Sequence, residues 1–386
     1  MSTTQVCFAM KRFSTPFIEG YTIGSRNLIR AACRAKVRAT VISAEPLNCP
    51  NENPGSYRLP TLFAENLHVA DLITASYMSL LPSLGDYDII HFLPNLAGDL
   101  YASFTYRRKR KSSAIIVHFS HPYEPYIHSP FSDFRLTVLC RKVLDYVFCI
   151  SNFLVEYFHK KIGIERSKVF CIPFPIDTDK YRPLSRKKEL RKRLGLSGEY
   201  IVAFTGQIES VRGAFVLLKA FNDVLKCADN VKLVVTNPGL SYENANLVLF
   251  EKMIKKLDVG DAVVLLNAQK NLEEIYNLAD AVVFPYTGLY YYMDPPLTLL
   301  EAMSSGAFVI ASKVGNVSNL ILDGENGKLV KPKSVTELSH SILDTMRDHI
   351  DGNALGYSAR KTILSKYSME VVGKSLAETY DAILRK

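Results

Sequence analysis

Residues 281–332 read AVVFPYTGLYYYMDPPLTLLEAMSSGAFVIASKVGNVSNLILDGENGKLVKP. Two short apolar runs, 281–285 and 307–312, flank a segment of helical character at 296–304. Runs that are apolar on both faces are typical of parallel strands covered by helices on both sides. This stretch therefore predicts a strand–helix–strand unit of a parallel α/β sheet.

The same alternation continues along the rest of the chain. Helical patterns separate further short apolar runs, which we expect to be strands at 4–10, 38–43, 88–93, 114–119, 145–150, 168–172, 201–206, 231–236 and 262–267. The proline-rich and charged segment 176–198 interrupts this rhythm, as a linker does. We therefore predict an α/β fold of two doubly wound domains with parallel sheets that face a cleft.

Composition narrows the class of protein. The 386 residues are 48% hydrophobic, which excludes a disordered chain. A net charge of +9 indicates an anionic partner: nucleic acid, a membrane surface or a phosphorylated small molecule. Seven cysteines without a C-x-x-C pair favour a reducing compartment. No run approaches the roughly 18 apolar residues that cross a bilayer, so we expect a cytoplasmic protein, at most peripheral at the membrane.

The loops after the strands are where a ligand is expected. Asp294 can cap a helix that begins with Pro295 and Pro296, and the resulting helix N-terminus suits a diphosphate. Glu301 lies seven residues later, on the same helical face, where it can accept hydrogen bonds from ribose hydroxyls. Spacing alone favours the alternative, a capped helix with a solvated glutamate, because Asp is common at a helix start.

At this point a family resemblance becomes visible. LLEAMSSGAFVIAS (299–312) and the following VGNVSNLILDGENGKLVKP resemble the donor-binding region of family 4 glycosyltransferases. Further segments agree with that family in order and spacing: YDIIHF, VHFSHP, DYVFCISNF, VFCIPFPIDTDKY, VAFTGQIESVRGAFVLLKAF and LEEIYNLADAVVFP. The resemblance implies the GT-B fold, with two Rossmann-like domains. It places an acceptor-side domain at 1–175, the donor-binding domain at 199–365, and a returning C-terminal helix at 366–386.

The resemblance also implies an activity. Such an enzyme, of the hexosyltransferase type, moves a sugar from a nucleotide diphosphate sugar to a lipid-linked or polysaccharide acceptor and retains the anomeric configuration. It needs no metal or other cofactor, because basic side chains and helix N-termini stabilise the leaving diphosphate. A UDP- or GDP-linked donor is expected. The alternative is a catalytically impaired nucleotide-sugar-binding or partner subunit of the same fold.

The donor residues follow from the matching positions. The family pattern Gly-Arg, then Lys-Gly, reads Gly206-Gln207 and Arg212-Gly213 here, so only Arg212 supplies a cation. The first of two family glutamates falls on Met293, one residue before Asp294, and these departures favour the alternative. The expected donor-binding residues are Gly206, Gln207, Arg212, Pro285, Asp294, Pro296, Leu297, Thr298 and Glu301.

The first domain is expected to supply the residues near the transferred sugar. His121 is the first candidate and His118 the second, whereas a structural histidine at a strand edge is the alternative. Gly20 and Gly24 lie in the loop FIEGYTIGSRN, where the family has a glycine-rich phosphate or acceptor loop. The expected catalytic set is His121, His118, Arg212 and Asp294.

Two basic clusters account for much of the charge. YRRKRK at 106–111 and RKKELRKRLG at 186–195 are candidates for contact with an anionic membrane surface. Solvated basic helix ends are the alternative for both. Nucleic acid is not an expected partner, because no basic sheet with interleaved aromatic residues is apparent.

Overall fold

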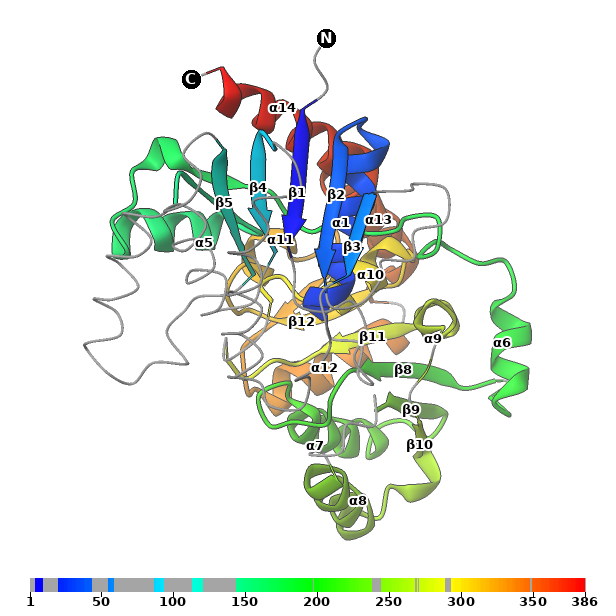
Figure 1. The fold of residues 1–386 in the computed structure, drawn as a ribbon. Helices are drawn as coiled ribbons and strands as arrows, with labels where there is room; N and C mark the ends of the chain where they lie inside the picture. The colour runs from blue at the N-terminus through cyan, green and yellow to red at the C-terminus, as the bar shows by residue number, and fades with distance from the viewer. Residues whose placement is uncertain are drawn as a thin grey trace. The chain divides into compact units, whose positions relative to one another are not determined.

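The computed structural model describes residues 4–9, 20–43, 55–58, 87–93, 113–120, 144–196, 198–237, 244–267, 269, 271–288, 293–347 and 349–385. The chain divides into two compact units. Unit 1 comprises Met1–Pro175, Tyr291–Asp294 and Tyr367–Lys386, and unit 2 comprises Ile176–Tyr290 and Pro295–Lys366. Each unit contains one parallel sheet with helices, as the sequence predicted (Figure 1).

Unit 1 contains a seven-stranded sheet with the order β3-β2-β1-β4-β5-β6-β7. Every neighbouring pair is parallel, and the order reverses direction between β1 and β4. The strands are β1 (Gln5–Ala9), β2 (Arg38–Ser43), β3 (Gly55–Arg58), β4 (Ile89–Phe92), β5 (Ala114–Phe119), β6 (Tyr146–Cys149) and β7 (Val169–Cys171). The described helices are α1 (Gly20–Arg34), α5 (Asn152–Glu156), which continues as a π-helical turn at Tyr157–Lys161, and α14 (Met369–Leu384).

The C-terminal helix α14 belongs to unit 1, so the predicted return of the chain is confirmed. Its first turn is capped by Ser368, whose hydroxyl accepts a hydrogen bond from the Val371 N–H at 3.3 Å. The helix packs closely on α1 at Gly373, where a Cβ would lie 2.4 Å from the carbonyl oxygen of Ala31. The absence of a side chain at Gly373 therefore sets the distance between the two helices.

We expect Gly373→Ala to destabilise unit 1 although alanine favours a helix. The gain in helix propensity is at most about 1 kcal/mol, whereas a clash with rigid backbone costs about 1–3 kcal/mol. Lys374→Ala is the matched control, because the Lys374 side chain is 78% exposed on the same helix. Thermal melts compare the two variants. A Gly373→Ala protein as stable as the Lys374→Ala protein would contradict this packing.

Unit 2 contains a six-stranded parallel sheet with the order β10-β9-β8-β11-β12-β13. Its strands are β8 (Tyr200–Thr205), β9 (Val231–Thr236), β10 (Val263–Leu266), β11 (Ala281–Phe284), β12 (Val309–Ser312) and β13 (Lys328–Val330). Its helices are α6 (Lys187–Arg193), α7 (Ala214–Leu225), α8 (Asn244–Leu257), α9 (Leu272–Leu278), α10 (Leu297–Ser304), α11 (Val317–Leu320), α12 (Val335–Met346) and α13 (Gly352–Lys366).

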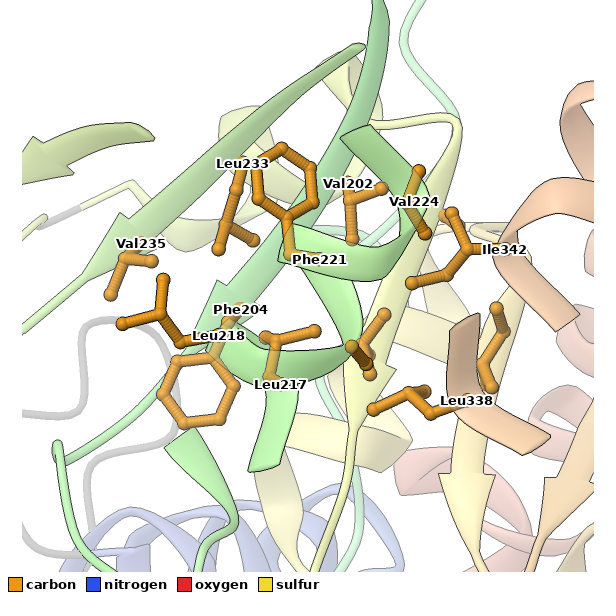
Figure 2. Packing of buried hydrophobic residues seen from close by; sticks show 14 of the residues in the cluster. Val202, Phe204, Leu217, Leu218, Phe221, Val224, Leu233, Val235, Leu338 and Ile342 are labelled. Carbon is orange, nitrogen blue, oxygen red and sulfur yellow. The ribbon is translucent and has the colours of Figure 1, made fainter. Parts of the chain in front are cut away.

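The core of unit 2 lies between this sheet and the helices α7 and α12. Apolar side chains recur along the whole of α7 at helical spacing, and these pack on the strands β8 and β9. Figure 2 labels Leu217, Leu218, Phe221 and Val224 of α7, Val202 and Phe204 of β8, Leu233 and Val235 of β9, and Leu338 and Ile342 of α12. This packing fixes the start of α7, and with it the loop that precedes the helix.

The segment 176–198 lies in unit 2 and contains α6. Its basic residues pair with carboxylates of the same unit. Arg186 and Arg193 bind Glu274 at 2.8 and 2.7 Å. Lys187 and Arg191 bind Asp280. These pairs account for four cations of the cluster 186–195 without a membrane surface, and the cluster 106–111 lies outside the described residues. Among the helices that the structure describes, none is both long and apolar enough to span a bilayer.

Candidate functional site

The strand order of unit 2 changes direction between β8 and β11. In an open parallel sheet, the carboxyl ends of the strands at such a point form the usual ligand-binding edge. The loops 206–213 and 285–288 follow these two strands. They are joined by the Thr287 N–H, which donates to the Val211 carbonyl at 2.8 Å, and by the Thr287 hydroxyl, which donates to the Ser210 carbonyl at 3.1 Å. The two loops thus form one surface, which brings Gly206, Gln207, Arg212 and Pro285 together.

Two glycines permit this arrangement. Gly206 has a φ of 134°, and Gly213 has a φ of 79°, values that favour glycine. A Cβ on Gly213 would lie 1.8 Å from the Pro285 carbonyl oxygen, so a side chain there would force the two loops apart. Gly213 is also the N-cap of α7. The Gly-x₆-Gly spacing of the sequence therefore reflects the close approach of the two loops.

Arg212 is the cation of this surface. Its Nη2 donates to the Gln207 Oε1 at 3.2 Å, and its Nε lies 3.8 Å from the Glu209 Oε2. The Arg212 side chain is 17% exposed. Burial raises the pKa of Glu209, and the neighbouring Arg212 opposes that rise. Gln207 adds no charge, but its amide oxygen fixes the direction of the Arg212 guanidinium.

The helix α10 begins later than the sequence predicted. Pro296 is its N-cap, with the extended backbone of φ −64° and ψ 139°, and the first helical residue is Leu297. A residue that precedes a proline is restricted to extended conformations, so Pro295 cannot open the helix. Asp294, 3% exposed, is therefore not the cap, and it groups with unit 1. The expectation that Asp294 and Glu301 share a helical face is wrong.

The N-terminal turn of α10 still presents backbone donors. Its N-cap, Pro296, makes no side-chain capping hydrogen bond, and Leu297 and the half-buried Thr298 supply its first N–H groups. These groups and the helix dipole favour an anion.

Glu301, on α10, is buried rather than solvated. Glu301 is only 2% exposed, and the Tyr276 hydroxyl donates to its Oε2 at 3.4 Å. Burial raises the pKa of Glu301 to about 7, although hydrogen bonds from Tyr181 and Tyr276 and the charge of Lys180 oppose the rise. The interpretation as a capped helix with a solvated glutamate is therefore wrong.

Of the two candidate histidines of unit 1, the structure describes His118 but not His121. His118 is fully buried within β5, and its Nε2–H donates to the Ile172 carbonyl at 2.8 Å. Its ring stacks on that of His91, with 5.3 Å between the centroids. Burial lowers the pKa of His118 to about 3, so His118 occupies the structural position that was the alternative. His121 lies outside the described residues.

The two glycines of the expected phosphate loop lie in α1. Gly20 is its first residue, and Gly24 lies one turn inside it. A Cβ on Gly24 would lie 2.3 Å from the Phe174 Cδ2. Gly24 therefore serves the packing of α1 on Phe174, and the loop interpretation is wrong for this residue.

Sequence reasoning missed the two tyrosines that contact Glu301. Tyr181 lies in the segment read as a linker, and Tyr276 lies in a helix whose apolar pattern explains its burial. Neither has a spacing that links it to Glu301, because the contacts arise only when α9, α10 and the segment before α6 fold together.

The fold agrees with comparisons to known proteins. The family model for glycosyl transferases group 1 matches residues 186–362, and that for glycosyltransferase family 4 matches residues 19–180. Together the two models cover most of the chain.

Individual relatives are distant. The lipopolysaccharide 1,2-N-acetylglucosaminetransferase of Salmonella typhimurium is 23% identical over 278 residues, which are 70% of this chain and 68% of that enzyme. The D-inositol 3-phosphate glycosyltransferase of Nocardia farcinica is 28% identical over 229 residues, 58% of this chain and only 49% of that enzyme.

Solved structures match over nearly the whole chain. Anabaena HepE in complex with UDP has a TM-score of 0.80 at 17% identity, covering 98% of this chain and 100% of that one. A Rickettsia africae glycosyltransferase has a TM-score of 0.81 at 16% identity, covering 100% of both chains.

Proposed function

Because the chain belongs to the group 1, family 4 glycosyltransferases with the GT-B fold, we propose that it transfers a sugar from a nucleotide diphosphate sugar to a lipid-linked or glycan acceptor. The reaction retains the anomeric configuration and needs no metal. The observation that supports this most is the surface at the strand reversal of unit 2, where loops 206–213 and 285–288 hold Arg212.

The chemistry of the leaving group assigns the roles. A nucleoside diphosphate gains negative charge as its bond to the sugar breaks, and groups that stabilise this charge lower the barrier. Arg212 supplies a planar cation with several donors, and the first turn of α10 supplies backbone donors. Glu301 is the acceptor for ribose hydroxyls. On the sugar side, His121 stays the candidate.

A UDP-sugar is the first candidate for the donor, and a GDP-sugar is the second. The HepE structures contain UDP, UDP with glucose, and UDP-glucose, which supports testing UDP-sugars first. The name of the Salmonella relative is that of a lipopolysaccharide enzyme, which supports a glycan or lipid-linked acceptor.

A second candidate function is a nucleotide-sugar-binding subunit without activity. Gln207 and Met293 favour it, because the first replaces a basic residue of the family pattern and the second a glutamate. The contact between Gln207 and Arg212 favours activity, since it orients the cation that remains.

A donor panel separates the two functions. The purified chain is incubated with UDP-, GDP- and ADP-sugars, with and without EDTA, and the released nucleoside diphosphate is measured. We expect turnover of one donor class that EDTA leaves unchanged. Binding without turnover, with and without lipid-linked or glycan acceptors, would support the inactive subunit. Turnover lost in EDTA and restored by a divalent cation would contradict metal independence.

A further inference from the structure

Glu301 lies at one end of a buried chain of hydroxyl groups. The Thr205 Oγ1 donates to the Tyr276 hydroxyl at 3.4 Å, and that hydroxyl donates to the Glu301 Oε2 at 3.4 Å. Thr205 is the last residue of β8, so the chain of contacts connects Glu301 to the edge of the sheet that carries Arg212. An ionised carboxylate has about four acceptor sites, so Glu301 can accept further donors besides the Tyr276 hydroxyl.

Tyr181 approaches the same carboxyl from the segment that precedes α6. Its side chain hydrogen-bonds Glu301, and its ring lies 6.2 Å from that of Tyr276 between centroids. The Tyr181 carbonyl accepts hydrogen bonds from the Ser304 hydroxyl at 2.7 Å and from Arg360 at 2.9 Å. The backbone of Tyr181 is thereby fixed to α10 and α13, so its hydroxyl has a defined position at Glu301.

Two charged groups also face Glu301. Lys180 precedes Tyr181, and Glu273 lies on α9 with Tyr276. Lys180 and Glu273 form an ion pair of 3.7 Å, and their effects on the Glu301 carboxyl oppose each other. The tyrosine hydroxyls are therefore the neutral groups that decide how well the ionised carboxylate is stabilised inside the protein.

The ionised and protonated forms of Glu301 are close in free energy at neutral pH. Burial raises the pKa of Glu301 to about 7, a value that already includes the opposing effect of hydrogen bonds from Tyr181 and Tyr276. An ionised carboxylate offers only acceptors to a pair of hydroxyls, whereas a protonated one loses acceptor sites. A small change in hydrogen bonding thus changes the fraction of protein able to bind at neutral pH.

We propose that Tyr276 and Tyr181 are positioning residues for the donor, holding Glu301 in the ionised form that accepts two hydroxyls of the nucleotide sugar. This inference rests on the proposed function for the identity of the ligand. It goes beyond that function because it makes donor affinity depend on two tyrosines whose hydroxyls hydrogen-bond Glu301.

The test is the pH dependence of nucleotide affinity in Tyr276→Phe. Removal of one hydroxyl raises the pKa of Glu301, so tight binding begins at a higher pH. We expect affinity for the nucleoside diphosphate to fall about three- to eight-fold at pH 6.5 and less than two-fold at pH 8.5. Titration of the nucleotide itself is the same in both experiments, so it cancels in the ratio of the wild-type affinity to the Tyr276→Phe affinity.

Tyr200→Phe is the matched control, because Tyr200 begins β8 whereas Thr205 ends it. The control should follow the wild-type profile. Tyr181→Phe should shift the profile in the same direction as Tyr276→Phe. An equal loss at both pH values, or no loss at either, would overturn the inference.

A measurement without ligand distinguishes this failure from failure of the proposed function. Because the pKa of Glu301 is raised on folding, the contribution of Glu301 to the free energy of unfolding falls as pH rises from 4.5 to about 7. Tyr276→Phe should extend that fall to higher pH, and Glu301→Gln should remove it. If no nucleotide binds but these melting profiles appear, only the proposed function fails. Identical profiles in all three proteins would overturn the inference.

Discussion

Replacement of Arg212 by alanine is expected to lower kcat/KM for the nucleotide sugar by about 10²–10³-fold. One preorganised donor at a developing negative charge is worth about 3–4 kcal/mol in the transition state, a change of that size. Arg212 is the only basic side chain in the loops 206–213 and 285–288, so no neighbour in them replaces its charge. Steady-state kinetics with the donor identified in the panel measure the effect.

Two further variants make this result specific. Arg212→Lys keeps the charge but loses the planar fork that meets Gln207, so we expect an intermediate loss. Lys226→Ala removes one positive charge just beyond the other end of α7, where the side chain is 66% exposed, and should leave kcat/KM unchanged. Equal activity of Arg212→Ala and Lys226→Ala would show that Arg212 does not stabilise the leaving group.

Acid is expected to destabilise unit 1 through its buried histidines. His91 and His118 are both fully buried, and the His91 Nδ1 lies 2.5 Å from the Tyr380 hydroxyl of α14. Burial lowers the pKa of His118 to about 3, and burial together with the neighbouring His118 lowers that of His91. Protonation therefore favours the unfolded chain. The histidines leave the free energy of unfolding unchanged above about pH 6.5 and lower it below that pH, by on the order of 4 kcal/mol for His118 at pH 3.

The measurement is a series of thermal melts between pH 8 and pH 4. The chain contains no tryptophan, so circular dichroism follows unfolding. His118→Phe should be less stable than wild type at pH 8, because the Ile172 carbonyl loses its side-chain donor, but should lose less stability on acidification. His340→Gln is the control, since His340 is exposed. An acid decline that is as steep in His118→Phe as in the control would contradict this explanation.

The two sheets and the returning helix could be predicted because their signals are local. Apolar runs such as IVAFT and VKLVVT are each complete within one strand, and the helices between them have their own period. The boundary of α10 was predicted two residues early, although Pro295 and Pro296 contain the information: the second proline keeps the first extended.

Burial of charged residues could not be predicted in the same way. Glu301 looked solvated because its partners Tyr181 and Tyr276 lie on other elements, and its environment exists only in the folded unit. The cluster 186–195 looked like a membrane-binding surface because its carboxylate partners, Glu274 and Asp280, lie 81 to 93 residues later. His118 and Gly24 likewise required Ile172 and Phe174, which follow after long intervals.

Hydrogen–deuterium exchange of the full chain with UDP, GDP or ADP most directly tests the location of the donor site. With the nucleotide of the active donor, we predict protection of backbone amides in 206–213, in 285–288 and in the first turn of α10, and loss of that protection in Arg212→Ala. Protection confined to peptides of unit 1, or equal protection in wild type and Arg212→Ala, would contradict a donor site at the strand reversal of unit 2.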